Sequence, residues 1–377
     1  MNLHFEEYKA RKIINIHKHV DGPWFWGKYT AHPYIGCRSG CDFCYLRGSR
    51  YLGQKDPDSF DTHIKIKANA AELFSKEIQK LEKDIISVGD WQQPAEDRYR
   101  LSRKLLEIVL NHEFPLFIVE RSPLLTRDLD LIKDINERSW VGIQYSISTL
   151  DEKLKRAFEP RSPGVKRRFE AISVFADAGI SVGVAFMPIF PFVGDDKKHL
   201  EDVIRAAKDH GASFIVGGGL TMDGHQATRT LHAADSYDQT LGDKWREFYR
   251  YTSPGKVSYS PPRQYNAKLA LRIRELCEKY GLLDRMPRYI IPGPLEVNKR
   301  LSEKLFLKTY DLEIEGASDY RIWAYRKAAW TVDELSRPID EIYKIEGING
   351  IRSLPNIGEK LSSQITKWLD KYALSMK

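Results

Sequence analysis

The chain of 377 residues contains little cysteine and no long apolar stretch. Its four cysteines are far too few for the disulfide framework of a small secreted protein, and the length allows two or three domains with cores of their own. No run approaches the roughly 18 apolar residues that a membrane helix requires. The first residues, MNLHFEEYKARK, place glutamates where a secretion signal has an apolar run. We therefore expect a cytoplasmic protein with no membrane partner.

The charge of the chain is nearly balanced, with a basic surplus. The 59 Lys and Arg residues exceed the 52 Asp and Glu residues and give a formal net charge of +7. Such a surplus favours a polyanionic partner such as nucleic acid. A surplus that serves only solubility would look the same, so composition alone leaves both interpretations open.

Helical and strand-like segments alternate through the first part of the chain. Five apolar runs each follow a stretch of helical spacing, and they cover residues 84–89, 116–120, 141–148, 181–189 and 213–219. The segment 34–36 is a candidate for a sixth strand. Strands that alternate with helices and are apolar enough to be buried on both faces are typical of a parallel sheet. We expect an α/β domain, open or closed as a barrel, with its chemistry on the loops that follow the strands.

The later part of the chain changes character twice. Residues 222–265 are polar, aromatic and rich in turn residues, and we expect a long ordered excursion near the mouth of the barrel. From about Ser318 the strand-like runs stop, and helical segments joined by a turn with Gly, Asn and Pro indicate a small all-α domain. The expected division is an α/β domain over 1–310 and a helical domain over 316–377.

Three of the cysteines are close together in a glycine-containing loop, HPYIGCRSGCDFCYLRG. They are Cys37, Cys41 and Cys44, near enough for one metal centre to take all three thiolates. A 4Fe-4S cluster held by three cysteines leaves one iron without a protein ligand, and an outside molecule can chelate that iron. The alternative is a zinc site completed by the distant His32 or Cys277.

This CxxxCxxC spacing, followed by an aromatic residue in an alternating strand and helix chain, resembles the radical S-adenosylmethionine superfamily. More narrowly, an ordered series of segments resembles the spore photoproduct lyase-like branch over about residues 30–220. The segments are HPYIGCRSGCDFCYLR, SVGDWQQPAED, FIVERSPLLTRDLDLI, SISTLDEKLKRAFEPRSPGVKRRFEAI and AGISVGVAFMPIFP.

The resemblance implies a partial (β/α)6 barrel that carries a 4Fe-4S cluster on the three cysteines and binds S-adenosylmethionine at the open iron. An electron from a donor such as flavodoxin or ferredoxin would cleave that cofactor to methionine and a 5′-deoxyadenosyl radical. The radical would take a hydrogen atom from a nucleotide in DNA, for repair or modification. The alternatives are a radical enzyme that modifies RNA and a non-catalytic nucleic-acid-binding protein with a structural cluster.

The resemblance also implies roles for residues at the strand ends. The loop of Gly89 and Asp90 should approach the amino group of methionine, a role that suits an anion, while a helix N-cap is the alternative for Asp90. Ser146 and Ser148 are expected to bond the ribose hydroxyls or the methionine carboxylate. Arg168 is expected to pair with the same carboxylate, unless it is a solvated helix charge.

One departure limits what the resemblance implies. Spore photoproduct lyases use an extra cysteine downstream of the cluster to return a hydrogen atom, and residues 45–220 contain no cysteine here. The thymine-dimer repair cycle of those enzymes is therefore in doubt for this chain. Tyr45, directly after the third cysteine, is the nearest candidate for a hydrogen relay, and a ring that only packs on the cluster is the alternative.

Two motifs characterise the C-terminal region. Residues 353–365, SLPNIGEKLSSQI, fit the helix-hairpin-helix pattern LPxIGxKxxxxI, and YRIWAYRKAAWTV upstream resembles the 8-kDa lyase domain of DNA polymerase beta. Backbone N–H groups of such a hairpin bind a phosphate oxygen without reading the base. The expected nucleic-acid contacts are Tyr325, Arg326, Lys327, Asn356, Gly358 and Lys360.

Two positions depart from these motifs. Asn356 replaces the first glycine of the hairpin, and asparagine tolerates a positive φ, so the turn should survive. Gln364 stands where the lyase domain has its Schiff-base lysine. An amide cannot form the imine, so we predict binding without lyase chemistry. An ordinary helical bundle with solvated basic residues is the alternative.

Overall fold

The computed structural model describes residues 3–22, 24–52, 56–253 and 255–375, and the chain divides into two compact units. Unit 1 comprises Met1–His17 and Gly27–Met286, and unit 2 comprises Lys18–Trp26 and Pro287–Lys377. None of the helices within the described ranges is long and apolar enough to cross a membrane.

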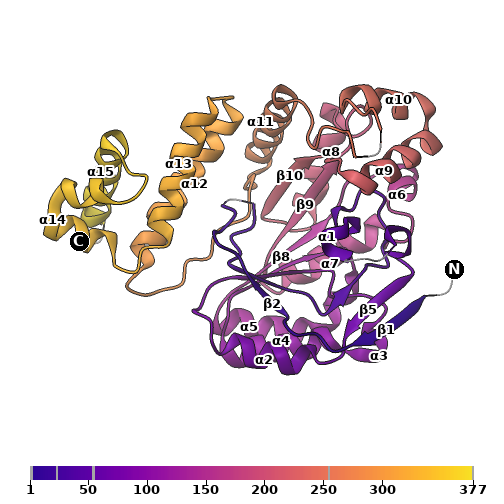
Figure 1. Ribbon diagram of the computed structural model, residues 1–377, viewed down its shortest axis with the longest axis horizontal. Coiled ribbons are helices and arrows are strands. Elements are labelled where there is room, and N and C mark those ends of the chain that lie inside the picture. The colour runs from indigo at the N-terminus through magenta and orange to yellow at the C-terminus, as the bar shows by residue number, and fades with distance from the viewer. Residues whose placement is uncertain (1–2, 23, 53–55, 254, 376–377) are drawn as a thin grey trace. The chain divides into compact units, whose positions relative to one another are not determined.

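Unit 1 is built on a seven-stranded sheet of order β10-β9-β8-β7-β6-β3-β2 (Figure 1). Antiparallel β2 (Ile14–Ile16) flanks β3, and the other strands pair in parallel. The parallel strands are β3 (Tyr29–Ala31), β6 (Ile86–Gly89), β7 (Leu116–Glu120), β8 (Val141–Ser146), β9 (Ser181–Ile189) and β10 (Phe214–Gly219). The predicted parallel α/β fold is confirmed, and five of these strands lie within the predicted runs.

The sixth strand candidate, segment 34–36, forms a strand, but not in the main sheet. Tyr34–Ile35 forms β4, which belongs to a separate three-stranded sheet of order β1-β5-β4, with β1 (His4–Tyr8) and β5 (His63–Lys67). The reason is pairing: Tyr34 lies opposite Ile66 of the antiparallel β5, and β3 takes the expected place beside β6. The chain therefore leaves the main sheet just before the three cysteines.

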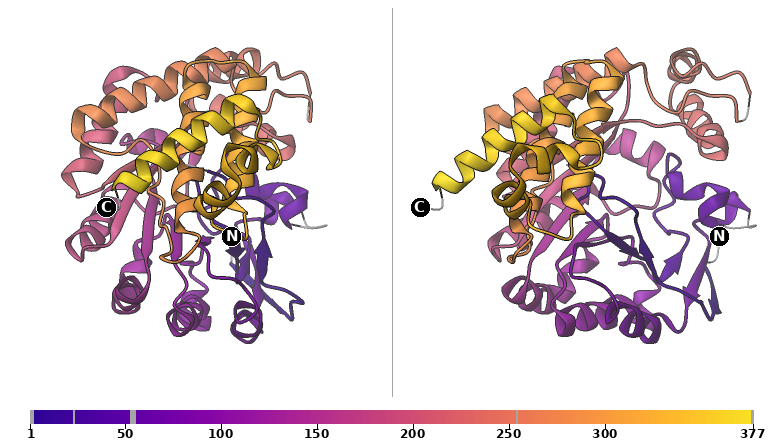
Figure 2. Two further views of the ribbon diagram at one scale, coloured as in Figure 1. Left: turned by 90° about the vertical axis from the view of Figure 1, so that its left-hand side faces the viewer. Right: turned by 60° about the vertical axis from the view of Figure 1, so that its left-hand side comes forward.

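Helices cover the outer face of the main sheet in an arc (Figure 2). They are α2 (Ala70–Ile78), α4 (Leu101–His112), α5 (Leu129–Arg138), α7 (Val165–Asp177), α8 (Lys197–Asp209) and α11 (Arg263–Tyr280). Tyr145 of β8 stacks on Phe175 of α7 with ring centroids 6.4 Å apart, so this residue points outward. Because side chains alternate along a strand, Gln144 and Ser146 point to the inner face of the sheet.

The inner face is closed at the amino ends of the strands by aromatic rings. Phe117 stacks on Trp140 at 6.4 Å and lies 6.5 Å from Phe214. Gly183, between them in the sheet, has no room for a side chain, since a Cβ atom there would lie 2.5 Å from Phe214. The opposite end, where the strands finish, is the end that carries the predicted site residues.

Residues 222–265 form an ordered segment, as expected, and it is largely helical, with α9 (Gly224–Tyr237) and α10 (Gln239–Phe248). A capping box between Asp223 and Gln226 starts α9, and the Asp238 carboxylate caps α10. Both helices pack around the buried Trp245, next to α6 (Glu152–Phe158). Short elements complete the unit: η1 (Tyr45–Arg47), α1 (Ser49–Leu52), η2 (Pro57–Ser59), α3 (Glu96–Tyr99) and η3 (Pro123–Asp128).

Unit 2 is helical as predicted, but it begins earlier than the expected boundary at 310–316. Its helices are α12 (Glu296–Ile314), α13 (Asp319–Asp333), α14 (Ile339–Ser353) and α15 (Glu359–Ser375). Helix α12 packs along α13 and buries Leu305 and Phe306, so it belongs to the helical unit. Buried Asp333 ties these helices to Arg288, Lys299 and Ser302, and the two cations lower its pKa against the opposing effect of burial.

Candidate functional site

The three cysteines lie in a loop shaped by two glycines. Gly36 has φ 92° and Gly40 has φ 63°, and a Cβ atom on Gly36 would lie 2.7 Å from the Phe60 carbonyl oxygen. Backbone N–H groups of Gly40 and Cys44 donate to the carbonyls of Cys37 and Cys41 at 3.2 and 3.3 Å. The loop therefore turns twice within a few residues and keeps Cys37 and Cys41 buried, with Cys44 half-buried.

Arg47 holds the cysteine loop in place through its side chain. Its side chain is fully buried and donates to the carbonyls of Cys41 and Gly40 at 3.0 and 2.9 Å and to that of Pro57 at 3.0 Å. Its guanidinium also lies 4.8 Å from the Phe60 ring centroid. A buried cation with its donors engaged by backbone carbonyls holds the loop in one conformation.

The thiols suit an iron–sulfur cluster. Burial raises the pKa of Cys41 to about 12, where Arg121 opposes the effect and Cys44 adds to it. Burial raises the pKa of Cys44 to about 11, and Asp90 acts in the same direction. Backbone N–H groups of Ser39 and Leu46 oppose this effect at Cys37 and Cys44. Such soft sulfur donors in a dry loop, with N–H groups directed at them, fit a metal cluster that supplies the missing positive charge.

The zinc alternative depends on a fourth ligand. Cys277 of α11 is fully buried in the main apolar core, in a different cluster of side chains from those around the other three cysteines. Among the described His, Cys, Asp and Glu side chains, no group of three or more is arranged to hold one metal ion.

Asp90 follows β6 and faces the cysteine loop. Its φ of 55° is rare for a residue other than glycine, and its Oδ1 lies 3.6 Å from Cys37 Sγ. The alternative role as a helix N-cap is wrong, since Ala95 precedes α3. Strain of this kind is maintained by surrounding structure and is common at functional sites. A carboxylate beside the cysteines can receive a ligand's ammonium group.

Glu120, at the end of β7, holds the loop that follows Asp90 through hydrogen bonds to its backbone. Its buried carboxylate accepts the backbone N–H groups of Trp91 and Gln92 at 2.8 and 3.1 Å. Burial, together with the charge of Asp90, raises the pKa of Glu120 to about 8. Gly89 keeps the strand ends close, because a Cβ atom there would lie 3.1 Å from the Val119 carbonyl oxygen.

Glu159 is the centre of a buried ionic network that corrects the expectation for Arg168. Arg168 is fully buried, and its Nη2 lies 2.6 Å from a carboxylate oxygen of Glu159. The same guanidinium donates to Ser162 Oγ at 2.6 Å and to the carbonyls of Pro163 and Ser146 at 2.8 Å. Arg168 is therefore neither a solvated helix charge nor a cation turned toward a ligand; it is part of the scaffold.

Ser146 and Ser148, the two serines predicted to bind the cofactor, contact the same ionic network. The Ser148 hydroxyl is buried and donates to Glu159 at 2.9 Å, and its contact with a cofactor stays a prediction. Ser146 offers its carbonyl to Arg168 and has a buried side chain at the end of β8. Burial alone would raise the pKa of Glu159, but Arg121 and Arg168 lower it to about 2. The carboxylate is thus held ionised inside the protein.

Arg121 was not predicted from the sequence, and it pairs with Glu159 from a second side. Its Nη1 is 2.7 Å from Glu159 Oε1, in an ion pair not aligned for a hydrogen bond, and its guanidinium lies 5.4 Å from the Phe43 ring centroid. Burial would lower the pKa of Arg121, but Cys41, Glu159 and Asp90 together raise it. The signal for it was its place directly after β7, where parallel strands present their functional side chains.

A second missed residue is Gln144, which points to the inner face of the sheet. Its side chain is fully buried, and neither amide atom has a hydrogen-bond partner within the described residues. Buried amides are rarely left without partners. A polar residue in the otherwise apolar run VGIQYS was the signal in the sequence.

Tyr45 is the exposed member of the cysteine loop. More than half of its side-chain surface, 55%, is accessible, and its ring meets Tyr51 edge-on at 5.4 Å. Its role as a hydrogen relay remains a prediction.

The hairpin of unit 2 has the geometry expected from its motif. Asn356 adopts a φ of 60°, as its place in the turn requires, and its side-chain amide donates to Thr331 of α13 at 3.2 Å. Gly358 and Lys360 are exposed at the start of α15. The Tyr325 hydroxyl donates to the side-chain oxygen of Gln364 at 2.8 Å, so the position of the Schiff-base lysine holds an amide engaged with α13.

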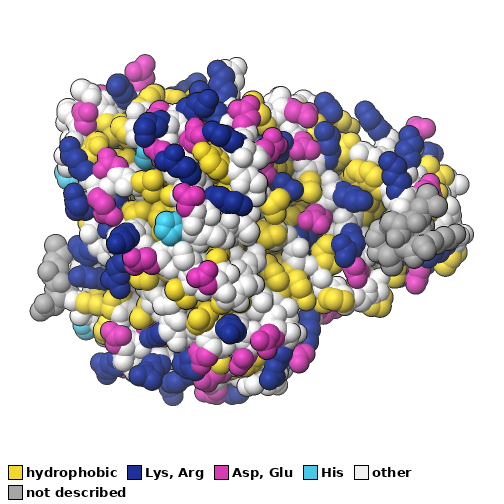
Figure 3. Space-filling model, turned by 180° about the vertical axis from the view of Figure 1, so that it is seen from behind, with side chains coloured by type: hydrophobic (Ala, Val, Ile, Leu, Met, Phe, Trp, Pro, Cys, Tyr) yellow, Lys and Arg dark blue, Asp and Glu magenta, His cyan; other side chains and the backbone are white. Residues whose placement is uncertain are grey.

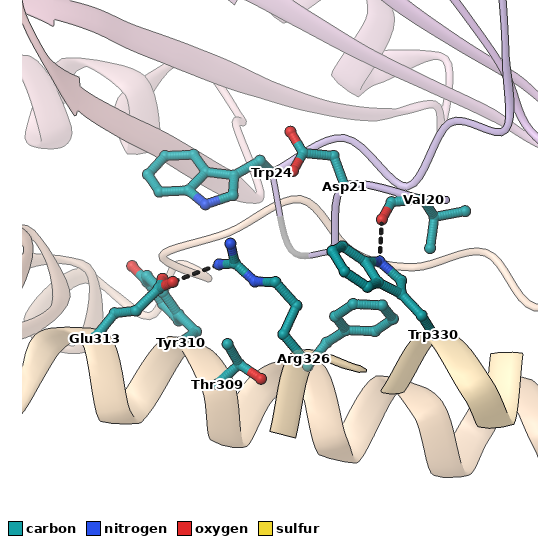
Figure 4. Close-up of a pocket in the computed structure, with 10 residues that line it drawn as sticks. Val20, Asp21, Trp24, Thr309, Tyr310, Glu313, Arg326 and Trp330 are labelled. Atoms are coloured by element: carbon teal, nitrogen blue, oxygen red, sulfur yellow. Dashed lines mark hydrogen bonds and ion pairs between the residues drawn. The ribbon is translucent and has the colours of Figure 1, made fainter. Parts of the chain in front are cut away.

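Arg326 departs from its predicted role. It lines a shallow pocket of unit 2 together with Trp24, Tyr310 and Trp330, and it pairs there with Glu313 of α12 (Figure 4). Its guanidinium also lies 5.3 Å from the Trp323 ring centroid. This ion pair engages Arg326 within its own unit, whereas Lys327 on the next position is exposed.

Comparison with known proteins agrees with both units. Residues 32–207 match the radical SAM superfamily, and residues 298–374 match a helix-hairpin-helix domain. The chain is 28% identical over 261 residues to an uncharacterized protein of Mycobacterium tuberculosis, covering 68% of this chain and 75% of that protein. It is 28% identical to an uncharacterized protein of Methanocaldococcus jannaschii, over 48% of this chain and 66% of that one.

Solved structures of spore photoproduct lyase share the fold. A single-residue variant superposes with a TM-score of 0.57 at 16% identity, covering 74% of this chain and 81% of that one. The complex of the enzyme with a dinucleoside spore photoproduct gives a TM-score of 0.56 with the same identity and coverage. The likeness to spore photoproduct lyase is one of fold, and the family matches cover residues 32–207 and 298–374.

Proposed function

We propose that this protein is a radical SAM enzyme that abstracts a hydrogen atom from a nucleotide in DNA, for repair or modification. A reduced 4Fe-4S cluster with S-adenosylmethionine at its open iron would supply the 5′-deoxyadenosyl radical. The observation that carries the proposal is the loop of Cys37, Cys41 and Cys44, with the half-buried Asp90 carboxylate 3.6 Å from Cys37 and the Arg121 guanidinium close to Cys41. A flavodoxin or ferredoxin would provide the electron.

In this proposal different residues of the chain bind different groups of the cofactor. The three thiolates hold the cluster, and the Asp90 carboxylate receives the ammonium group of methionine next to Cys37. Arg121 takes the role first assigned to Arg168, because it follows β7 directly and its charge lies near Cys41. Glu159 and Arg168 hold Arg121 and the end of β8 in place.

The helix-hairpin-helix domain supports a nucleic-acid substrate. In the proposal the backbone of the hairpin turn, from Asn356 to Gly358, binds one phosphate, and exposed Lys327 and Lys360 add charge. Acidic and basic side chains are interspersed over the face shown in Figure 3, so recognition there would depend on local contacts. With Gln364 engaged by Tyr325, we expect no cleavage of abasic sites through an imine.

The proposal is tested by following the abstracted atom. Reduced enzyme is incubated with S-adenosylmethionine and with DNA or RNA oligonucleotides deuterated in the sugar and base, including candidate lesions. Deuterium in 5′-deoxyadenosine supports abstraction from that nucleic acid, and label from RNA alone favours the RNA alternative. Turnover of the cofactor without label from any nucleic acid would mean that the substrate belongs to another class.

A further inference from the structure

Helix α13 presents an exposed aromatic face. Tyr320 and Trp323 keep 86% and 46% of their side-chain surface accessible, although large apolar side chains are usually covered. Trp330 lies on the same face, 6.1 Å from the Trp323 ring, but His19 stacks on it at 4.4 Å and its N–H donates to the Val20 carbonyl at 3.0 Å, so it is engaged within unit 2. Lys327 lies between Trp323 and Trp330 and is exposed. Spacings of three, four and three residues place these side chains in one row along the helix.

The opposite face of α13 is the one that holds unit 2 together. Ile322, Ala328, Ala329 and Val332 are buried there, so stability of the unit does not depend on Tyr320 or Trp323. An exposed row of rings that serves no core is typical of an interaction surface.

Two further observations indicate what covers this row. Cations accompany the rings: Arg321 and Lys327 are exposed, and the Arg326 guanidinium lies over Trp323. The hairpin turn also meets the same helix, since Asn356 donates to Thr331, the residue after Trp330. The aromatic row thus leads directly to the proposed phosphate site.

We propose that the row of Tyr320, Trp323 and Lys327 is a stacking platform for an unpaired nucleic-acid strand. Flat rings stack on base faces, which are accessible only where the bases are unpaired, and neighbouring cations follow the backbone. The platform rests on the proposed function and refines its substrate class: the enzyme binds single strands, or duplexes opened at the target, in preference to intact duplex.

The test measures binding alone, with the full-length protein and no S-adenosylmethionine. Probes are labelled single strands of about 16 nucleotides in DNA and RNA form, and a DNA duplex of the same sequence, at one salt concentration. For the double variant Tyr320→Ala, Trp323→Ala we expect the affinity for single strands to fall about tenfold or more for each ring. Duplex affinity should stay within about twofold, because the hairpin remains intact.

Two controls keep this test specific. Ile345→Ala removes an apolar side chain of unit 2 that is 73% exposed and lies outside the row, and it should change neither affinity. Trp323→Phe should retain most of the single-strand binding, because a ring remains. Thermal melting of each variant checks that the fold is unchanged.

The possible outcomes separate this inference from the proposed function. A selective loss for single strands supports the platform. Equal loss for both probes, or no loss for either, overturns it, and no loss in protein that still binds DNA would point to a protein partner for this face. A wild-type protein that binds no probe would contradict the nucleic-acid substrate itself, whereas failure of the cofactor to react would contradict only the radical chemistry.

Discussion

The cysteine loop of unit 1 and the hairpin of unit 2 use charged side chains in opposite ways. Around the cysteines, Arg47, Glu159 and Arg168 are almost wholly buried and held by partners from several loops. In unit 2, Lys327 of α13 and Lys360 of the hairpin are exposed. The difference teaches that buried ions next to the cysteines give a site its shape, whereas exposed ions in the helical unit are available to a ligand.

The largest effect should follow from the cysteines themselves. Replacing Cys37, Cys41 or Cys44 by Ala removes one of three ligands, and we expect the visible absorbance and the bound iron of the anaerobically reconstituted protein to be lost almost completely. Cys277→Ala should retain both, because that thiol lies in the apolar core. Iron analysis of the four variants checks the prediction, and equal iron content in all of them would contradict it.

Arg168 and its neighbour Arg167 test whether a buried charge matters more for stability than an exposed one. Arg168→Ala removes one of the two cations that pair with buried Glu159, and we expect the free energy of unfolding to fall by about 3–5 kcal/mol. Arg167→Ala removes an exposed charge and should change it by about 0.5 kcal/mol or less. Urea unfolding measures both values. Similar losses for the two variants would mean that burial does not distinguish them.

Low pH should remove the stability that ionised Glu159 contributes to the fold. A carboxyl group whose pKa is lowered to about 2 in the folded state contributes stability above its unfolded pKa, near 4.5, and loses it as the pH falls toward 2. The gap in unfolding free energy between wild type and Glu159→Gln should therefore shrink by about 3 kcal/mol over this range. Unfolding curves at several pH values test this, and a constant gap would argue against an ionised Glu159.

The smallest effect is expected on the hairpin. Lys360→Ala should weaken DNA binding a few-fold and reduce the slope of log affinity against log salt by about 0.7–0.9, the value for one phosphate contact. Lys367→Ala removes an equally exposed lysine two turns further along α15 and should leave the slope unchanged. Fluorescence anisotropy over a salt series compares the two. Equal slopes for both variants would place the phosphate elsewhere.

The parts of this fold that depend on local patterns were predictable from the sequence. Apolar runs bounded by turns predicted five of the six parallel strands, and the motif around Asn356 predicted a turn with positive φ. Segment 34–36 misled because a short apolar run does not reveal its pairing partner, here β5. Residues 222–265 contain helices because capping by Asp223 and Asp238 offsets a weak apolar period.

The site was predictable in its ligands but not in its ions. Cysteine spacing is a local feature, so the three thiols could be identified directly. The proposed exchange of roles between Arg121 and Arg168 depends on how the fold arranges both guanidiniums around Glu159, and the contact of Arg121 with Glu159 joins different segments of the chain. Arg326 misled for the same reason, because its partner Glu313 lies on α12.

The most direct measurement of the central claim is the cleavage of S-adenosylmethionine by the reduced protein. After anaerobic reconstitution with iron and sulfide and addition of dithionite, we expect the wild-type protein to form 5′-deoxyadenosine and methionine in equal amounts. Cys41→Ala should form neither, and Cys277→Ala should match wild type. Cleavage that survives in Cys41→Ala, or an absence of cleavage by wild-type protein that holds its full complement of iron, would contradict the account.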